Sequence, residues 1–102
     1  MKECCKQYLA EQFGDDADLI GEIYSEYVKS LGEKVAEAAA AFESRDWLKL
    51  DRAAHTVKGN ALSVGDTETA ETAISLRQAA KLEDAAEAAP LVEKLRQALG
   101  TV

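Results

Sequence analysis

The spacing of apolar residues between positions 19 and 42 constrains the fold more than any other feature of the sequence. These residues recur at intervals of three and four, so they share one face of an α-helix. A helix of about 28 residues, from Asp15 or Asp16 to about Ser44, is roughly 40 Å long and would form the main strut of a bundle. The stripe consists of Leu19, Ile20, Ile23, Tyr24, Tyr27, Leu31, Val35, Ala38 and Phe42.

Two neighbouring segments show the same helical spacing. Residues 1–12 predict a short amphipathic helix that ends at Gly14, where a left-handed C-cap costs little. A further helix starts after Asp46, a favourable N-cap residue, and runs up to Gly65. We expect its buried face to comprise Trp47, Leu50, Ala54, Val57, Ala61 and Val64.

The last two segments are also helical in pattern. One begins at Thr67, with Glu68 nearby, and ends between Lys81 and Asp84. We expect its inward positions to be Ala70, Ala73, Ile74, Leu76 and Ala80, and its solvent-facing positions to be Thr69, Glu71, Glu83 and Asp84.

The final segment presents Ala88, Leu91, Val92, Leu95 and Leu99. Pro90 lacks a backbone donor, so it either kinks this helix or begins it, in which case Ala85–Ala89 form a looser lead-in.

The pattern as a whole predicts an all-α fold. The 102 residues contain only six Gly and one Pro, and long helices joined by two to five residues pack most simply in antiparallel pairs. We therefore expect a single domain over residues 1–102. Its architecture should be an antiparallel up-down-up-down four-helix bundle with a short additional N-terminal helix.

Net charge and the apolar runs exclude several classes of partner. A formal charge of −7 and the lack of a basic stripe argue against binding to nucleic acid. No apolar run approaches the roughly 20 residues that span a bilayer, and residues 1–6 lack the apolar core of a signal peptide. A soluble cytoplasmic protein without membrane contact is the expectation.

The two cysteines, Cys4 and Cys5, are adjacent, so they cannot connect distant segments. Together with one distant histidine they do not match the ligand spacing of a zinc site. We interpret them as ordinary thiols in a reducing compartment and expect no metal; a vicinal redox pair is the less favoured alternative.

The only histidine, His55, carries the chemical information in the sequence. It follows the buried position Ala54 by about 100° of rotation, so we expect it to be exposed at the edge of the core stripe. Lys58 and Gly59 lie three and four residues further on and share its face. Asp51, Arg52 and Leu62 extend the same strip.

This grouping suits phosphoryl transfer. A neutral imidazole is an available nucleophile, and an ammonium group one turn away stabilises the negative phosphoryl group. Glycine in the middle of a helix is unfavourable by roughly 0.5–1 kcal/mol, which indicates that another molecule approaches the backbone at Gly59. Singly, however, an exposed His, a solvated Lys and a helix Gly are more often ordinary surface features.

The run His55-Thr56-Val57-Lys58-Gly59-Asn60-Ala61, followed by Leu62-Ser63-Val64-Gly65, resembles the signature of histidine-containing phosphotransfer (HPt) domains. That signature reads His-x-hydrophobic-Lys-Gly-small-Ala, followed by an apolar residue and Gly. The family's four-helix bundle, with its active histidine midway along the second long helix, also matches the predicted segments over nearly the whole chain.

The resemblance implies that His55 accepts the phosphoryl group on Nε2, that Lys58 stabilises it and that Gly59 leaves room for a receiver domain. Two positions depart from the family: Asn60 replaces the commoner Ser or Ala, and Arg77 stands where many relatives carry Glu or Gln. Arg77 and Gln78 are therefore candidates to orient the imidazole or the phosphoryl group, with solvated surface as the equal alternative.

The resemblance also implies the partners. They are receiver domains of response regulators and a hybrid sensor kinase, with Leu48 and Leu62 in the docking surface and any metal supplied by the receiver. The acidic net charge would help to orient a receiver with a basic rim. We expect a monomeric phosphoryl carrier with no cofactor, no nucleotide site and no kinase activity of its own.

Two other classes of function compete with this interpretation. A catalytically silent helical adaptor could bind a protein partner through the same face, and His55 would then be incidental. A hydrolytic or metal enzyme is less favoured, because no Ser or Cys nucleophile and no second His is placed to complete a site.

Overall fold

The computed structural model describes residues 1–102 and contains five helices and no strands. The helices are α1 (Glu3–Phe13), α2 (Ala17–Glu43), α3 (Trp47–Ser63), α4 (Thr67–Lys81) and α5 (Ala85–Ala98). The predicted all-α class is confirmed. The molecule measures 44 × 20 × 18 Å, and the 27 residues of α2 account for most of the long dimension.

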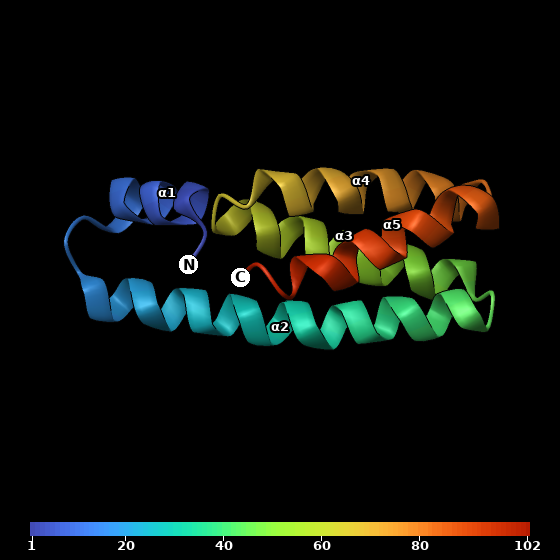
Figure 1. Ribbon diagram of the computed structural model, residues 1–102, viewed down its shortest axis with the longest axis horizontal. Coiled ribbons are helices and arrows are strands. Elements are labelled where there is room, and N and C mark those ends of the chain that lie inside the picture. The colour runs from blue at the N-terminus through green and yellow to red at the C-terminus, as the bar shows by residue number, and fades with distance from the viewer.

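The helices lie along one common direction (Figure 1). From α2 to α5, each helix runs back along the one before it, and α3 packs against both α2 and α4. The last helix, α5, packs against α4 and α2. The short α1 lies beside the N-terminal part of α2, nearly end to end with α4 (Figure 1).

Three turns of the same design connect α2 to α5. In each turn a residue with positive φ, Arg45, Gly65 or Glu83, follows the end of one helix. The next residue is an aspartate whose backbone N–H reaches a carbonyl five residues earlier, as in a Schellman motif. The aspartate side chain then accepts a hydrogen bond from a backbone N–H of the next helix. Three residues therefore suffice to end one helix and cap the next.

Small side chains dominate the buried core. Eleven of its 23 hydrophobic residues are alanines, which lets the helix backbones approach one another closely. The larger members fill the space between the alanines; those with almost no exposed surface are Leu9, Leu31, Leu50, Leu76 and Leu95.

A buried carboxylate, Asp66, ties the N-terminal segment to the bundle. It caps α4 through the Thr69 N–H (3.3 Å), accepts a hydrogen bond from the Tyr27 hydroxyl (2.6 Å) and pairs with Lys2 Nζ (3.0 Å). Burial alone would raise the pKa of Asp66, but the hydrogen bonds from Tyr27, Lys2 and Thr69 outweigh it and lower that pKa below 3.8.

Other ionisable groups of this cluster prefer their ordinary protonation states. Burial and the bond to Asp66 raise the pKa of the Tyr27 phenol, and burial raises the pKa of the Cys5 thiol to about 12. Burial opposes the charge on Lys2, yet the hydrogen bond to Asp66 outweighs this effect and raises the pKa of Lys2. The cluster is thus stable with Asp66 ionised, Lys2 charged, and Tyr27 and Cys5 neutral.

A close contact also holds α1 in place. Gly65 has φ +74°, and a Cβ added there would collide with Cβ of Tyr8 and lie 2.6 Å from its Cγ. Only glycine meets both requirements, the left-handed backbone and the close approach of α1.

Four side chains lie differently from the sequence-based expectation. Thr69 was expected at the surface but is buried, because the Asp66 cap draws the start of α4 into the core. Ile74 was expected in the core but is 42% exposed, and Leu19 and Leu99, near the ends of α2 and α5, are also exposed. The cap of α4 is Asp66, while the predicted first residue, Thr67, is confirmed.

Pro90 lies inside α5, which begins at Ala85 and is capped by Asp84. The proposed looser lead-in at Ala85–Ala89 is therefore wrong. With Asp84 supplying the cap, the helix forms a full turn before Pro90, which has no N–H to donate to the preceding turn.

Replacing Asp66 by Asn tests the buried cluster. The substitution removes the charge that Lys2 and Tyr27 face, so we expect the free energy of unfolding to fall by about 2 kcal/mol. The lowered pKa of Asp66 means that its stabilising effect is complete above pH 3.8 and is lost as the pH falls through the folded-state value. Urea denaturation from pH 7 to pH 3 should therefore show less loss of stability in acid for Asp66→Asn than for the wild type.

Asp84→Asn is the matched control, because it changes a partly exposed cap whose side chain makes only the bond to the Glu87 N–H. Asn caps helices about as well as Asp, so this variant should stay within about 0.5 kcal/mol of the wild type. Equal effects at the two positions would show that Asp66 acts only as a cap.

Candidate functional site

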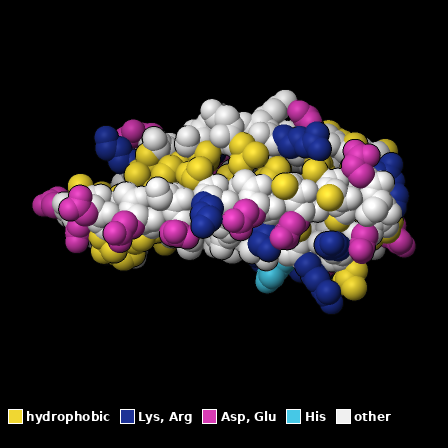
Figure 2. Space-filling view, turned by 90° about the horizontal axis from the view of Figure 1, so that it is seen from below, with side chains coloured by type: hydrophobic (Ala, Val, Ile, Leu, Met, Phe, Trp, Pro, Cys, Tyr) yellow, Lys and Arg dark blue, Asp and Glu magenta, His cyan; other side chains and the backbone are white.

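The core residues of α3 determine which side of this helix faces solvent. Leu50, Ala54, Val57 and Ala61 are buried with almost no exposed surface. His55 follows Ala54 by about 100° and is exposed, as the spacing predicts. Figure 2 shows the imidazole at the edge of the molecule with Lys or Arg side chains nearby.

Two exposed leucines lie in line with His55. Leu48 and Leu62 are seven residues before and after it, so both project within about 20° of the same direction. Their side chains are 60% and 49% exposed, respectively. His55 therefore lies midway along a line between two exposed leucines on an open surface.

Two cations flank this line. Arg52 and Lys58 are three residues before and after His55, about 60° to either side of it. Arg52 is exposed and Lys58 is partly buried, and neither forms an ion pair. Both charges are thus available to a negatively charged group at the imidazole.

Gly59 leaves free space on the same strip. A Cβ added to this residue would meet no heavy atom within 4 Å beyond its neighbours in the chain and the backbone of its own helix. Packing inside the protein therefore does not require glycine at this position.

Polar contacts attach the strip to the neighbouring helix on each side. Towards α2, Asn60 Nδ2 donates to Ser30 Oγ at 2.6 Å. Towards α4, Arg77 Nε donates to Asp51 Oδ1 at 2.9 Å, with both side chains about three-quarters buried. His55 lies between these two attachments, on a part of α3 that is held from both sides.

The structure places the two candidate residues of α4 differently. Arg77 reaches the strip through Asp51, one turn before His55. Gln78 is exposed and its side chain makes no hydrogen bond within the protein. Because α4 runs back along α3 (Figure 1), the pairing of 51 with 77 brings Ile74 to the level of Ala54 and His55.

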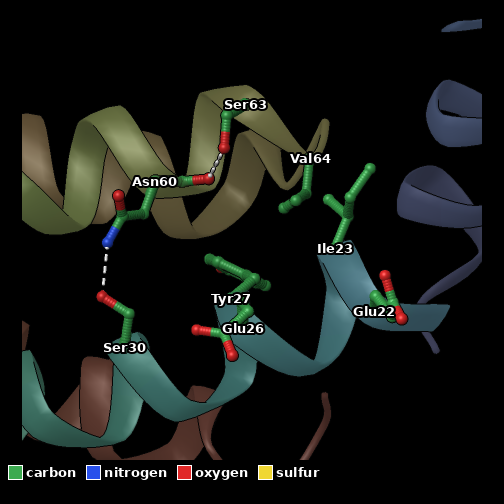
Figure 3. Close-up of a pocket in the computed structure, with 8 residues that line it drawn as sticks. All are labelled: Glu22, Ile23, Glu26, Tyr27, Ser30, Asn60, Ser63 and Val64. Atoms are coloured by element: carbon green, nitrogen blue, oxygen red, sulfur yellow. Dashed lines mark hydrogen bonds between the residues drawn. The ribbon is translucent and has the colours of Figure 1, made fainter. Parts of the chain in front are cut away.

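A solvent-open groove of about 500 Å³ lies between α2 and α3 (Figure 3). Two carboxylates, Glu22 and Glu26, line it, and the Asn60 to Ser30 hydrogen bond crosses it. His55 lines neither this groove nor the other main cavities. The candidate site is therefore an open surface and not a pocket.

The structure shows no cluster of three or more His, Cys, Asp or Glu side chains that could hold a metal ion. None of the five helices combines the length and apolar composition needed to cross a membrane.

Comparison with known proteins assigns most of the chain to a protein family. The family model of the Hpt domain matches residues 22–102, which leaves α1 and the first residues of α2 outside the match. No curated protein and no solved structure shows a significant match. The strip around His55 lies within the matched region.

A double-mutant cycle at Asp51 and Arg77 tests the attachment of α4. We expect Asp51→Ala and Arg77→Ala each to lower the free energy of unfolding by about 1 kcal/mol, since each leaves a partly buried charge without its partner. The double variant should lose less than the sum, with a coupling of about 0.5–1 kcal/mol in urea denaturation. Gln78→Ala should change stability by less than about 0.5 kcal/mol. Additive losses would mean that the ion pair contributes nothing to stability.

Proposed function

Because this chain belongs to the Hpt domain family, whose members carry phosphoryl groups on histidine in phosphorelays, we propose that His55 is its phosphoryl acceptor. The observation that carries the proposal is the exposed imidazole at the centre of α3, between the unpaired cations Arg52 and Lys58. It is the only histidine in the chain. The donor is an aspartyl phosphate of a receiver domain, and a second receiver takes the group on.

The transfer is an in-line displacement at phosphorus. The lone pair of His55 Nε2 forms the new P–N bond while the bond from phosphorus to the aspartyl oxygen breaks, and that electron pair stays on the aspartate carboxylate. The reverse reaction delivers the phosphoryl group to the next aspartate. The protein contributes position and charge, which such a transfer needs most.

The neighbouring residues have separate roles in this proposal. Lys58, one turn beyond His55, stabilises the negative phosphoryl oxygens in the transition state and on the phosphohistidine. Gly59 keeps free the space into which the receiver's phosphate-bearing loop enters. Arg77 acts through Asp51 by fixing α4 beside the strip, and Gln78, whose exposed side chain makes no hydrogen bond in the free protein, is available to the partner or the phosphoryl group.

We further propose that α2 to α5 form the family's up-down-up-down bundle and that residues 1–102 act as one module. The direction of the helices in Figure 1 and the packing of α3 against both α2 and α4 support this arrangement. It places His55 near the middle of the bundle's side, where a globular receiver can contact α3 and α4 together.

Replacement of His55 tests the proposed function directly. The wild type, incubated with a panel of phosphorylated receiver domains, should gain acid-labile phosphate that peptide mass mapping places on residue 55. His55→Ala should gain none, whereas its urea midpoint should be unchanged because the side chain is exposed. Phosphate on another residue, or full biological function of His55→Ala, would favour the silent adaptor instead.

Substitution of Gly59 separates partner access from folding. Because nothing surrounds the site of an added Cβ, Gly59→Ala should raise the free energy of unfolding by about 0.5–1 kcal/mol. Gly59→Leu should also stay folded, yet it should slow transfer from a receiver at least ~10-fold, because the leucine side chain would fill the space that the receiver's loop enters. A ~10-fold slowing requires the activation free energy to rise by only about 1.4 kcal/mol.

Gly21→Leu is the matched control for Gly59→Leu. Gly21 lies within α2, also has free space at its Cβ and is outside the family match. We expect no change in the transfer rate for this variant. Unimpaired transfer in Gly59→Leu would exclude the proposed role of Gly59.

A further inference from the structure

The surface around His55 has the opposite charge from the rest of the protein. The chain as a whole carries −7, and α2 alone contains six carboxylates but only two lysines. In contrast, α3 contains three cations, Lys49, Arg52 and Lys58, and one carboxylate, Asp51. The helix that presents the phosphoryl acceptor is therefore a cationic region in an acidic protein.

Ion pairing increases the difference in charge between α3 and the rest of the protein. The single carboxylate of α3, Asp51, is already bound by Arg77, so its charge is compensated. None of the three cations of α3 forms an ion pair. The helix holds two of these charges, those of Arg52 and Lys58, on either side of the imidazole.

The two charged regions lie on adjacent sides of the molecule. Figure 2 shows a row of Asp and Glu side chains along α2, with His55 and several Lys and Arg side chains along the lower edge. The exposed carboxylates of α2 include Asp18, Glu22, Glu26, Glu33 and Glu37. An acidic partner would be repelled by α2 and attracted by α3, so the charges alone would orient it on the side of His55.

We propose that the docking face, formed by Leu48, Arg52, Lys58, Gly59 and Leu62 around His55, binds an acidic face of its receiver domain, and that Arg52 selects partners by charge. The inference rests on the proposed function and specifies its partner. It reverses the expectation from net charge, which favours a receiver with a basic rim. The exposed leucines supply apolar contact, while the cations determine which receivers approach productively.

The test compares two charge reversals that change the net charge equally. Arg52→Glu alters the docking face, whereas Lys94→Glu alters α5, which packs against α4 and α2. Both side chains are exposed and unpaired, so both variants should fold. Phosphotransfer from receivers that phosphorylate the wild type is measured at about 10 mM and 100 mM salt, where the screening length falls from about 30 Å to about 10 Å.

For the wild type, we expect salt to reduce the second-order rate constant of transfer. Arg52→Glu should reduce that constant at least ~10-fold at low salt and reverse or abolish its salt dependence. Labelling of His55 by the small donor phosphoramidate, which does not need the docking face, should fall much less than the rate constant of transfer from a receiver. Lys94→Glu should stay within about two-fold in all of these measurements.

Several outcomes would overturn the inference without touching the proposed function. Equal behaviour of Arg52→Glu and Lys94→Glu, or a wild-type rate that rises with salt, would show that net charge and not the docking face governs the encounter. Loss of phosphoramidate labelling in Arg52→Glu would assign Arg52 to the chemistry instead.

Binding of unphosphorylated receivers, measured by calorimetry, tests the charge argument even if no receiver transfers phosphate. Affinity should increase with the acidity of the receiver surface around its phosphate-accepting aspartate, and this trend should weaken in Arg52→Glu. Affinity independent of that acidity would contradict the inference. Failure of every receiver to label His55, by contrast, would count against the proposed function.

Discussion

The structure depends on α3 having one side buried in the core and another side exposed to solvent. Its apolar residues Leu50, Ala54, Val57 and Ala61 pack in the centre of the bundle. Burial of such a row fixes the rotation of the helix about its axis, because turning it would expose apolar surface at about 25 cal/mol per Å². The same packing therefore keeps His55 in solvent, and the core determines the direction in which its imidazole projects.

Much of this arrangement follows from the sequence because helical periodicity is a local property. The spacing predicted the five helices to within a few residues and identified the strip that contains His55, Lys58 and Gly59. The conformation of the turns was harder to predict from the sequence. Arg45 and Glu83 adopt a backbone conformation that usually signals glycine, so their role appears only in the hydrogen-bonding pattern of the turn.

The side-chain positions that the sequence did not predict depend on tertiary contacts. Thr69 is drawn inward because Asp66 caps α4 while also binding Tyr27 and Lys2, which are distant in the chain. The pairing of Arg77 with Asp51 depends on the register of α4 against α3, which no local pattern encodes. That register also leaves Ile74 at the surface, although its spacing along α4 is compatible with the core.

The contact between Tyr8 and Gly65 limits how this chain can vary. Position 65 ends the turn into α4, within the region shared with the Hpt family, and position 8 belongs to a helix outside that region. A larger residue at position 65 would displace α1. Displacement of α1 from the bundle would expose its residues Leu9 and Cys5, which are now fully buried. A side chain at position 65 can therefore be accommodated only if α1 shifts, and α1 contributes to the hydrophobic interior through Leu9 and Cys5.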